Sequence, residues 1–277
     1  MYIDTHTREN MEKSICEYLG INSEDLLKLI EKAPYDCHLL DMNEFSRIIN
    51  DFLDEHWPKE QIDQVLFFHL SRRLNESIDN VNCYNLAYLL TEDSTLNHFL
   101  KKYGIEFIRE QEHIKLYYNK KEQNIDFYQN AGYLKKRLGY YNIKDYCFNG
   151  FAFKDILYRN EYSKMLLEGP EFIINLGDNF KSINLCKDYC QKSRYFCYEY
   201  CFPIEKVLFD ENENMTTQEK QRYLITQIII RLYHYNQFSI KNMSDDDNPI
   251  LRLRDSEILD ASFFKDKEEI TEEMLKN

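Results

Sequence analysis

The sequence predicts an α+β fold: a central mixed β-sheet with flanking helices, a helical N-terminal region and a buried C-terminal helix. Three observations predict this fold class. The first 60 residues show helix caps and helical apolar spacing, the middle has short apolar runs, and one long apolar helix lies near the end. We divide the 277 residues into an N-terminal helical region (1–60), an α+β core that would be catalytic (61–210), and a C-terminal helical segment that packs on the core (211–277).

Three helices are predicted in the N-terminal region. They run from about Asn10 to Leu19, from Ser23 to a point before Pro34, and from about Asp41 to His56. Gly20 ends the first of them, as a glycine in the left-handed conformation commonly does. Asp41 and Glu44 would cap the third helix reciprocally.

The middle segment alternates apolar runs with helical spacing. We expect strands at 64–71, 105–107, 113–118, 125–128, 146–153 and 195–209, and helices at 84–103, at 155–167 and after Gly169-Pro170. A capping box, Thr216 with Glu219, starts a further helix that ends near Asn236. Its stretch 225–232 is apolar nearly all round, which predicts burial.

Composition and charge narrow the functional classes. The apolar fraction of 43% suffices for a large core, and no run is long enough to span a bilayer. The net charge of −13 disfavours general nucleic-acid binding, although the near-neutral middle between acidic flanks permits a small anionic cofactor. The polar N-terminus lacks the apolar segment of a signal peptide, so we expect a cytoplasmic protein without membrane contact.

The eight cysteines predict reduced thiols rather than disulfides in a chain of this length. Cys186, Cys190, Cys197 and Cys201 invite a zinc interpretation, but their spacing differs from that of usual zinc knuckles, and we expect no metal. The motifs of serine hydrolases, P-loop ATPases and Rossmann dehydrogenases are absent from the sequence.

One candidate constellation surrounds His69. A strand of period two places Phe67, His69 and Ser71 on one face, with Arg72 and Arg73 at the strand end. Imidazole, hydroxyl and guanidinium groups together suit a pyrophosphate or a ribose. The alternative is a buried histidine that a backbone carbonyl satisfies, with arginines paired on the surface.

A second candidate is Glu199, in the middle of an aromatic strand. Alternation separates Tyr198, Tyr200 and Phe202 from Cys197, Glu199 and Cys201. A carboxylate is costly to bury without partners, so Glu199 either faces water on an edge strand or lines a cleft. In a cleft it could orient a substrate hydroxyl and stabilise a developing cation.

Together, these strands resemble the ADP-ribosyltransferase-like superfamily over roughly residues 61–210. The resemblance implies NAD as co-substrate, His69 holding its ribose, and Glu199 as the catalytic carboxylate. It also implies that small residues around Gly150 let nicotinamide approach the backbone. Within the likeness, Cys197 stands where arginine-modifying members carry a second glutamate, so modification of protein arginine is disfavoured.

The aromatic residue that would stack on nicotinamide is not fixed by the sequence. The candidates are Tyr103, Tyr117, Tyr118, Tyr133, Tyr140 and Tyr141. We expect Tyr133 and Tyr141, which flank the basic run Lys135-Lys136-Arg137, to be among the cofactor-binding residues, without assigning either to the nicotinamide. That run could hold a phosphate, or it could be a solvated helix face.

We therefore expect an NAD-dependent ADP-ribosyltransferase-like enzyme of the toxin or phage-defence effector type, acting on an unidentified macromolecule. The hypothesis requires His69 and Glu199 to line one cavity. The alternative is a non-enzymatic acidic interaction protein, antitoxin-like or inhibitory, whose acidic flanks cover a basic partner surface. A nucleic-acid-modifying enzyme that uses the 133–141 patch is a third option.

Overall fold

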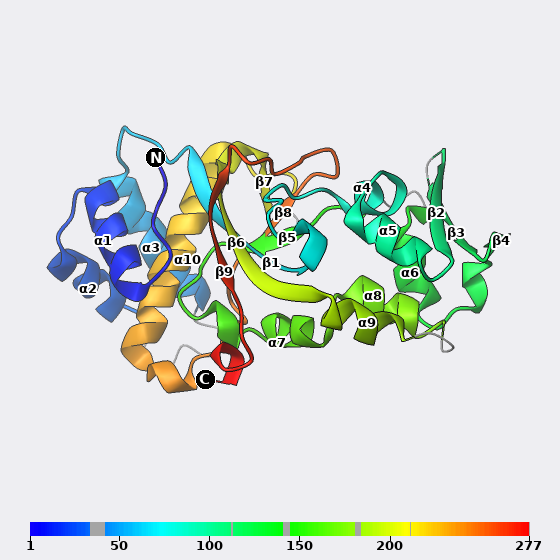
Figure 1. The fold of residues 1–277 in the computed structure, drawn as a ribbon. Helices are drawn as coiled ribbons and strands as arrows, with labels where there is room; N and C mark the ends of the chain where they lie inside the picture. Colours follow the sequence, from blue (N-terminus) through cyan, green and yellow to red (C-terminus); the bar gives the residue numbers. More distant parts are fainter. Residues whose placement is uncertain (34–41, 112, 141–144, 181–183, 211, 277) are drawn as a thin grey trace.

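The computed structural model describes residues 1–33, 42–111, 113–140, 145–180, 184–210 and 212–276 (Figure 1). Its first helices are α1 (Arg8–Leu19), α2 (Ser23–Glu31) and α3 (Met42–His56). The Thr7 side chain accepts from the Asn10 amide at the start of α1, and Gly20 ends the helix with φ of +65°. The predicted Asp41 cap lies outside the described residues.

Six strands form the central sheet in the order β7-β8-β5-β1-β6-β9. Their bounds are β1 (Gln64–Leu74), β5 (Asn149–Phe151), β6 (Ser193–Pro203), β7 (Val207–Phe209), β8 (Ile250–Leu253) and β9 (Phe264–Glu269). β1 and β6 pair along their whole length, from Gln64 opposite Pro203 to Leu74 opposite Ser193. Every pairing in this sheet is antiparallel, so the α+β class is confirmed but the predicted mixed sheet is wrong.

One face of the sheet is covered by α10 (Thr217–Gln237), which lies between the N-terminal helices and the strands (Figure 1). Phe67 and Tyr198 belong to the same buried cluster as Ile228 and Ile229 of this helix. The predicted capping box is present, and the Thr216 side chain accepts from the Glu219 amide. The other face carries α7 (Glu161–Glu168), whose Leu166 packs with Leu66 and Phe68.

A smaller lobe lies beside the sheet (Figure 1). It consists of α4 (Leu86–Thr91), α5 (Thr95–Lys101), β2 (Ile105–Glu110), β3 (His113–Tyr118), β4 (Lys121–Glu122), α6 (Ala131–Arg137), α8 (Glu171–Gly177) and α9 (Leu185–Gln191). These elements share a separate apolar core that includes Leu90, Ile114, Leu134 and Leu176. The smaller lobe therefore has an apolar core of its own, separate from the clusters on the two faces of the sheet.

Several predicted elements differ from the structure. Residues 125–127 form a 3-10 turn instead of a strand, because the Asn124 side chain accepts from the Asp126 amide and turns the chain. The single helix expected at 84–103 is two, since Ser94 starts a new one by capping Asn97. The tail is not only helical: β8 and β9 come from it and complete the sheet.

Candidate functional site

A cavity of about 560 Å³ lies along the edge of β1, between the sheet and the smaller lobe. The six residues from His69 to Leu74 all line it. This edge is open because β5 meets β1 only where Phe151 faces Phe68, and no other strand of the described residues pairs with β1 on that side. The volume lies within the range of small-molecule sites.

Of the seven residues predicted to bind a cofactor, five line this cavity: His69, Ser71, Arg72, Arg73 and Tyr133. Gly150 is not among the lining residues, and Tyr141 lies outside the described residues. The strand reasoning around His69 therefore located a real concave site. The same reasoning did not define what each of the predicted cofactor-binding residues does.

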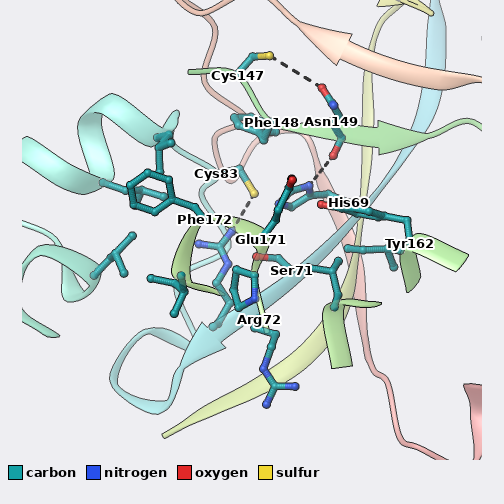
Figure 2. A pocket seen from close by; sticks show the side chains of 18 of the residues that line it. His69, Ser71, Arg72, Cys83, Cys147, Phe148, Asn149, Tyr162, Glu171 and Phe172 are labelled. Atoms are coloured by element: carbon teal, nitrogen blue, oxygen red, sulfur yellow. Dashed lines mark hydrogen bonds between the residues drawn. The ribbon is translucent and has the colours of Figure 1, made fainter. Parts of the chain in front are cut away.

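His69 is neutral at pH 7. Its Nδ1 donates to the Asn149 carbonyl oxygen at 2.7 Å, a contact drawn in Figure 2. Burial, and then the positive charge of Arg73, lower the pKa of His69 to about 4. Because Nδ1 carries the proton, Nε2 is a hydrogen-bond acceptor. The carbonyl contact matches the structural alternative for this histidine, but the residue also lines the cavity.

Arg73 has no acidic partner among the residues that the structure describes. One of its terminal nitrogens donates to the Cys83 Sγ at 2.8 Å and to the Asn82 carbonyl oxygen at 3.3 Å. The guanidinium carbon lies 4.9 Å from the centre of the Tyr198 ring. Its Nε is buried and has no hydrogen-bond partner in the described part of the chain. A half-buried cation that has no counter-ion among the described residues, beside a cavity, is a natural contact for an anionic ligand.

Arg72 lines the cavity, but its guanidinium extends away from His69, Ser71 and Glu171 (Figure 2). Its guanidinium donates to the carbonyl oxygens of Leu167, Cys190 and Ser193 and to the Ser193 hydroxyl, at 3.0 to 3.2 Å. The nitrogen atoms that would donate to a ligand thus already donate to these protein oxygens. Arg72 ties the end of β1 to the ends of α7 and α9, and we assign it a structural role.

Gly150 is needed for packing. A methyl group at this position would overlap the ring of Phe67, which stands over it. The expectation that small residues here admit nicotinamide to the backbone is therefore wrong, because an aromatic side chain of the protein occupies that space.

Glu199 does not share the cavity with His69. Residues that face each other on paired strands project on the same side, and Glu199 is opposite Phe68, whereas His69 is opposite Tyr198. The imidazole and the carboxylate therefore lie on opposite faces of the sheet. Glu199 is also on the far side of β1 from the open edge. The predicted His69–Glu199 pair in one hollow is wrong.

Glu199 instead binds a histidine of the N-terminal segment. The His6 Nε2 lies 2.8 Å from a Glu199 carboxylate oxygen, and its Nδ1 lies 2.7 Å from an Asp4 carboxylate oxygen. The hydrogen bond to Glu199 and, more weakly, that to Asp4 raise the pKa of His6, while burial opposes them. The expectation of an edge-strand glutamate is also wrong, since β6 lies between β1 and β9.

Other residues complete the cavity, and the sequence analysis missed them. They are contributed by both lobes and include Cys83, Tyr84, Arg137, Phe148, Tyr162, Glu171 and Asp246. Figure 2 shows His69, Ser71 and Glu171 gathered at one part of it. Glu171 follows Gly169-Pro170 as the first residue of α8. That sequence marks a helix start but carries no signal of a ligand site.

The basic run and the cysteine cluster have structural explanations. Lys135 pairs with Asp126, and Lys136 and Arg137 contact Asp145 at 3.7 and 3.0 Å. Cys186 and Cys190 lie on α9, whereas Cys197 and Cys201 are buried in β6. Within the described ranges, no group of three or more His, Cys, Asp or Glu side chains is arranged to hold a metal ion.

None of the helices in the described parts of the chain has both the length and the apolar character required to cross a membrane. Comparison of the chain with protein-family models, with curated proteins and with solved structures finds no match in any of the three.

Proposed function

We propose that the inter-lobe cavity binds a small anionic ligand, with NAD as the first candidate. One observation carries the proposal: the half-buried Arg73, whose Nε is buried and unpartnered, lines the cavity without a carboxylate partner among the described residues. Isolated buried charges are unfavourable, so a site that retains one gains most from a ligand of opposite charge.

The remaining walls suit a nucleotide. Tyr84 is stacked on Tyr88 with ring centres 4.4 Å apart, and Phe148 lies 5.3 Å from the His69 ring. Aromatic side chains with a few polar groups are the usual composition of ligand pockets. The neutral His69 supplies an acceptor for a ligand hydroxyl or amide. NAD is chosen as the candidate because of the sequence resemblance. The charge of Arg73 and the volume of the cavity are compatible with a ligand of this kind.

The proposal is tested by incubating the protein with NAD and measuring nicotinamide release and thermal stability. A ligand present at 100 times its dissociation constant stabilises the native state by about 2.7 kcal/mol. In a chain of this size we expect the melting temperature to rise by about 5–10 °C. Absence of both the stabilisation and nicotinamide release would remove NAD as the candidate.

The position of Glu199 favours a second candidate, because the hypothesis of catalysis by the His69–Glu199 pair has lost its geometry. This candidate is an acidic interaction protein, supported by the net charge of −13. Pull-down experiments at low and high salt separate the two, since a partner held by charge is released as ionic strength rises. A salt-sensitive partner together with no response to NAD would favour the second candidate.

A further inference from the structure

Two cysteine side chains of α9 converge on one point of the backbone. Cys186 and Cys190 are four residues apart on this helix, so their side chains lie on the same face. Each thiol donates a hydrogen bond to the carbonyl oxygen of Glu168, at 3.4 Å from the Cys186 Sγ and 3.3 Å from the Cys190 Sγ. A carbonyl oxygen has two lone pairs and can accept both bonds. The two sulfur atoms are therefore neighbours that share one acceptor.

The chain turn between α7 and α8 also lies against both sulfur atoms. A methyl group added at Gly169 would be 2.9 Å from the Cys186 Sγ and 3.4 Å from the Cys190 Sγ. Burial, and then the neighbouring Cys190 thiol, raise the pKa of Cys186 to about 11. Two points of this turn, the Glu168 oxygen and the Gly169 carbon, thus place the two thiols in the same small space.

The pair can be reached from solution. Both thiols are free, and both side chains are only partly buried. Neither Cys186 nor Cys190 is among the residues that line the inter-lobe cavity. Most of the other cysteines in the described ranges are buried, namely Cys83, Cys147, Cys197 and Cys201. The accessible pair on α9 is therefore distinct from the ligand site proposed above.

The helical spacing of the pair favours a bridge through a third atom over a disulfide. Side chains at i and i+4 of a helix have Cβ atoms about 5–6 Å apart, whereas a disulfide requires about 3.5–4.5 Å. An atom bonded to both sulfurs at about 2.3 Å, the length of a zinc–thiolate bond, lets the sulfurs stay up to about 4.6 Å apart. The helix can therefore hold such a bridge without unwinding.

The number of donors narrows the chemistry of the bridging atom. A structural zinc ion takes a full tetrahedral set of ligands, and no group of three or more His, Cys, Asp or Glu side chains in the described parts of the chain is arranged to supply one. Two thiols alone suit a thiophilic centre that needs only two sulfur donors. Trivalent arsenic that carries one organic substituent is such a centre.

We propose that Cys186 and Cys190 form a dithiol modification site for a monosubstituted trivalent arsenical. In the reaction with an arylarsenoxide, two arsenic–sulfur bonds form and the bonds between arsenic and oxygen break. The oxygen leaves as water with the two thiol protons. Arsenic stays trivalent, so the step requires no oxidant or reductant.

The experiment treats the folded protein with one equivalent of phenylarsine oxide, and excess 2-mercaptoethanol then removes adducts held by a single sulfur. Intact-mass spectrometry should show one phenylarsenic group per chain. Trypsin cleaves after Lys187, between the two cysteines. Arsenic should therefore link the peptide that ends at Lys187 to the peptide that begins at Asp188.

Serine variants test whether both thiols are needed. Cys186→Ser and Cys190→Ser each leave one thiol of the pair and should reduce the adduct at least tenfold. The control Cys16→Ser removes a partly buried cysteine of α1 and should leave the adduct unchanged.

An adduct that persists in either variant of the pair would overturn the assignment of the dithiol site. Absence of an adduct in the unmodified protein, or an adduct mapped to other cysteines, would also overturn it. The peptide map requires no substitution and decides the question even if a serine variant does not fold. None of these outcomes depends on whether the protein binds NAD.

Discussion

The substitution Glu199→Gln separates a structural role of this carboxylate from a catalytic one. Glu199 lies on the sheet face opposite His69 and binds His6 at 2.8 Å. The two side chains are 11% and 29% exposed. Exposed ion pairs contribute about 0.2–1 kcal/mol, whereas breaking a buried one costs about 3–5 kcal/mol. We therefore expect Glu199→Gln to lower the free energy of unfolding by about 1–2 kcal/mol.

The stabilisation by the His6–Glu199 pair should depend on pH in a defined direction. The pKa of His6 is raised in the folded protein above its ordinary value of 6.5. The stabilisation by the pair is therefore fully present below pH 6.5 and is lost as the pH rises through the raised pKa. The stability difference between the unmodified protein and Glu199→Gln should be largest at about pH 6 and smaller at about pH 9.

Urea denaturation at both pH values measures the effect, and calorimetric titration with NAD checks that binding is unchanged. The control Glu205→Gln changes an exposed carboxylate of the following turn and should leave stability within about 0.5 kcal/mol. The reasoning would be refuted if Glu199→Gln kept full stability but abolished NAD binding or nicotinamide release.

Three further predictions follow from the packing and the site. Gly150→Ala should cost about 1–3 kcal/mol, because the added methyl group overlaps the Phe67 ring; a melting temperature equal to that of the unmodified protein would contradict this packing. Thr216→Ala should cost about 1 kcal/mol through loss of the helix cap, measured by urea denaturation, and no change would argue against the cap. Since the pKa of His69 is about 4, NAD affinity should be constant between pH 6 and 8; calorimetry that shows a step near 6.5 would contradict a neutral His69.

Local signals in the sequence predicted the elements that local interactions determine. Gly20 and the pair of Thr216 and Glu219 mark helix ends through contacts within a few residues, and both are observed as predicted. The β1 strand was also predicted, although it extends to Leu74. The segment at 125–128 was misassigned, because the Asn124 cap competes with its apolar pattern.

The sequence could not show which strands are neighbours, and the pairing of the strands determines which side chains share the cavity. The period of two correctly placed His69 and Ser71 on one face, but the face of Glu199 relative to His69 depends on the register of β1 with β6. Glu171 and Asp246 come from segments distant in the sequence from β1, so their convergence on the cavity depends on tertiary structure alone. No local signal marks the role of His6, because its partner Glu199 is 193 positions away.

Calorimetric titration of Arg73→Met with NAD tests the central claim most directly. Methionine removes the charge while retaining an apolar side chain of similar length, and Arg109→Met removes the same charge from an exposed position outside the cavity lining. Losing a buried charged contact costs about 2–5 kcal/mol, so we expect Arg73→Met to bind NAD at least 30-fold more weakly and Arg109→Met to bind as the unmodified protein does. Equal affinity in all three proteins would contradict the claim that Arg73 holds the ligand.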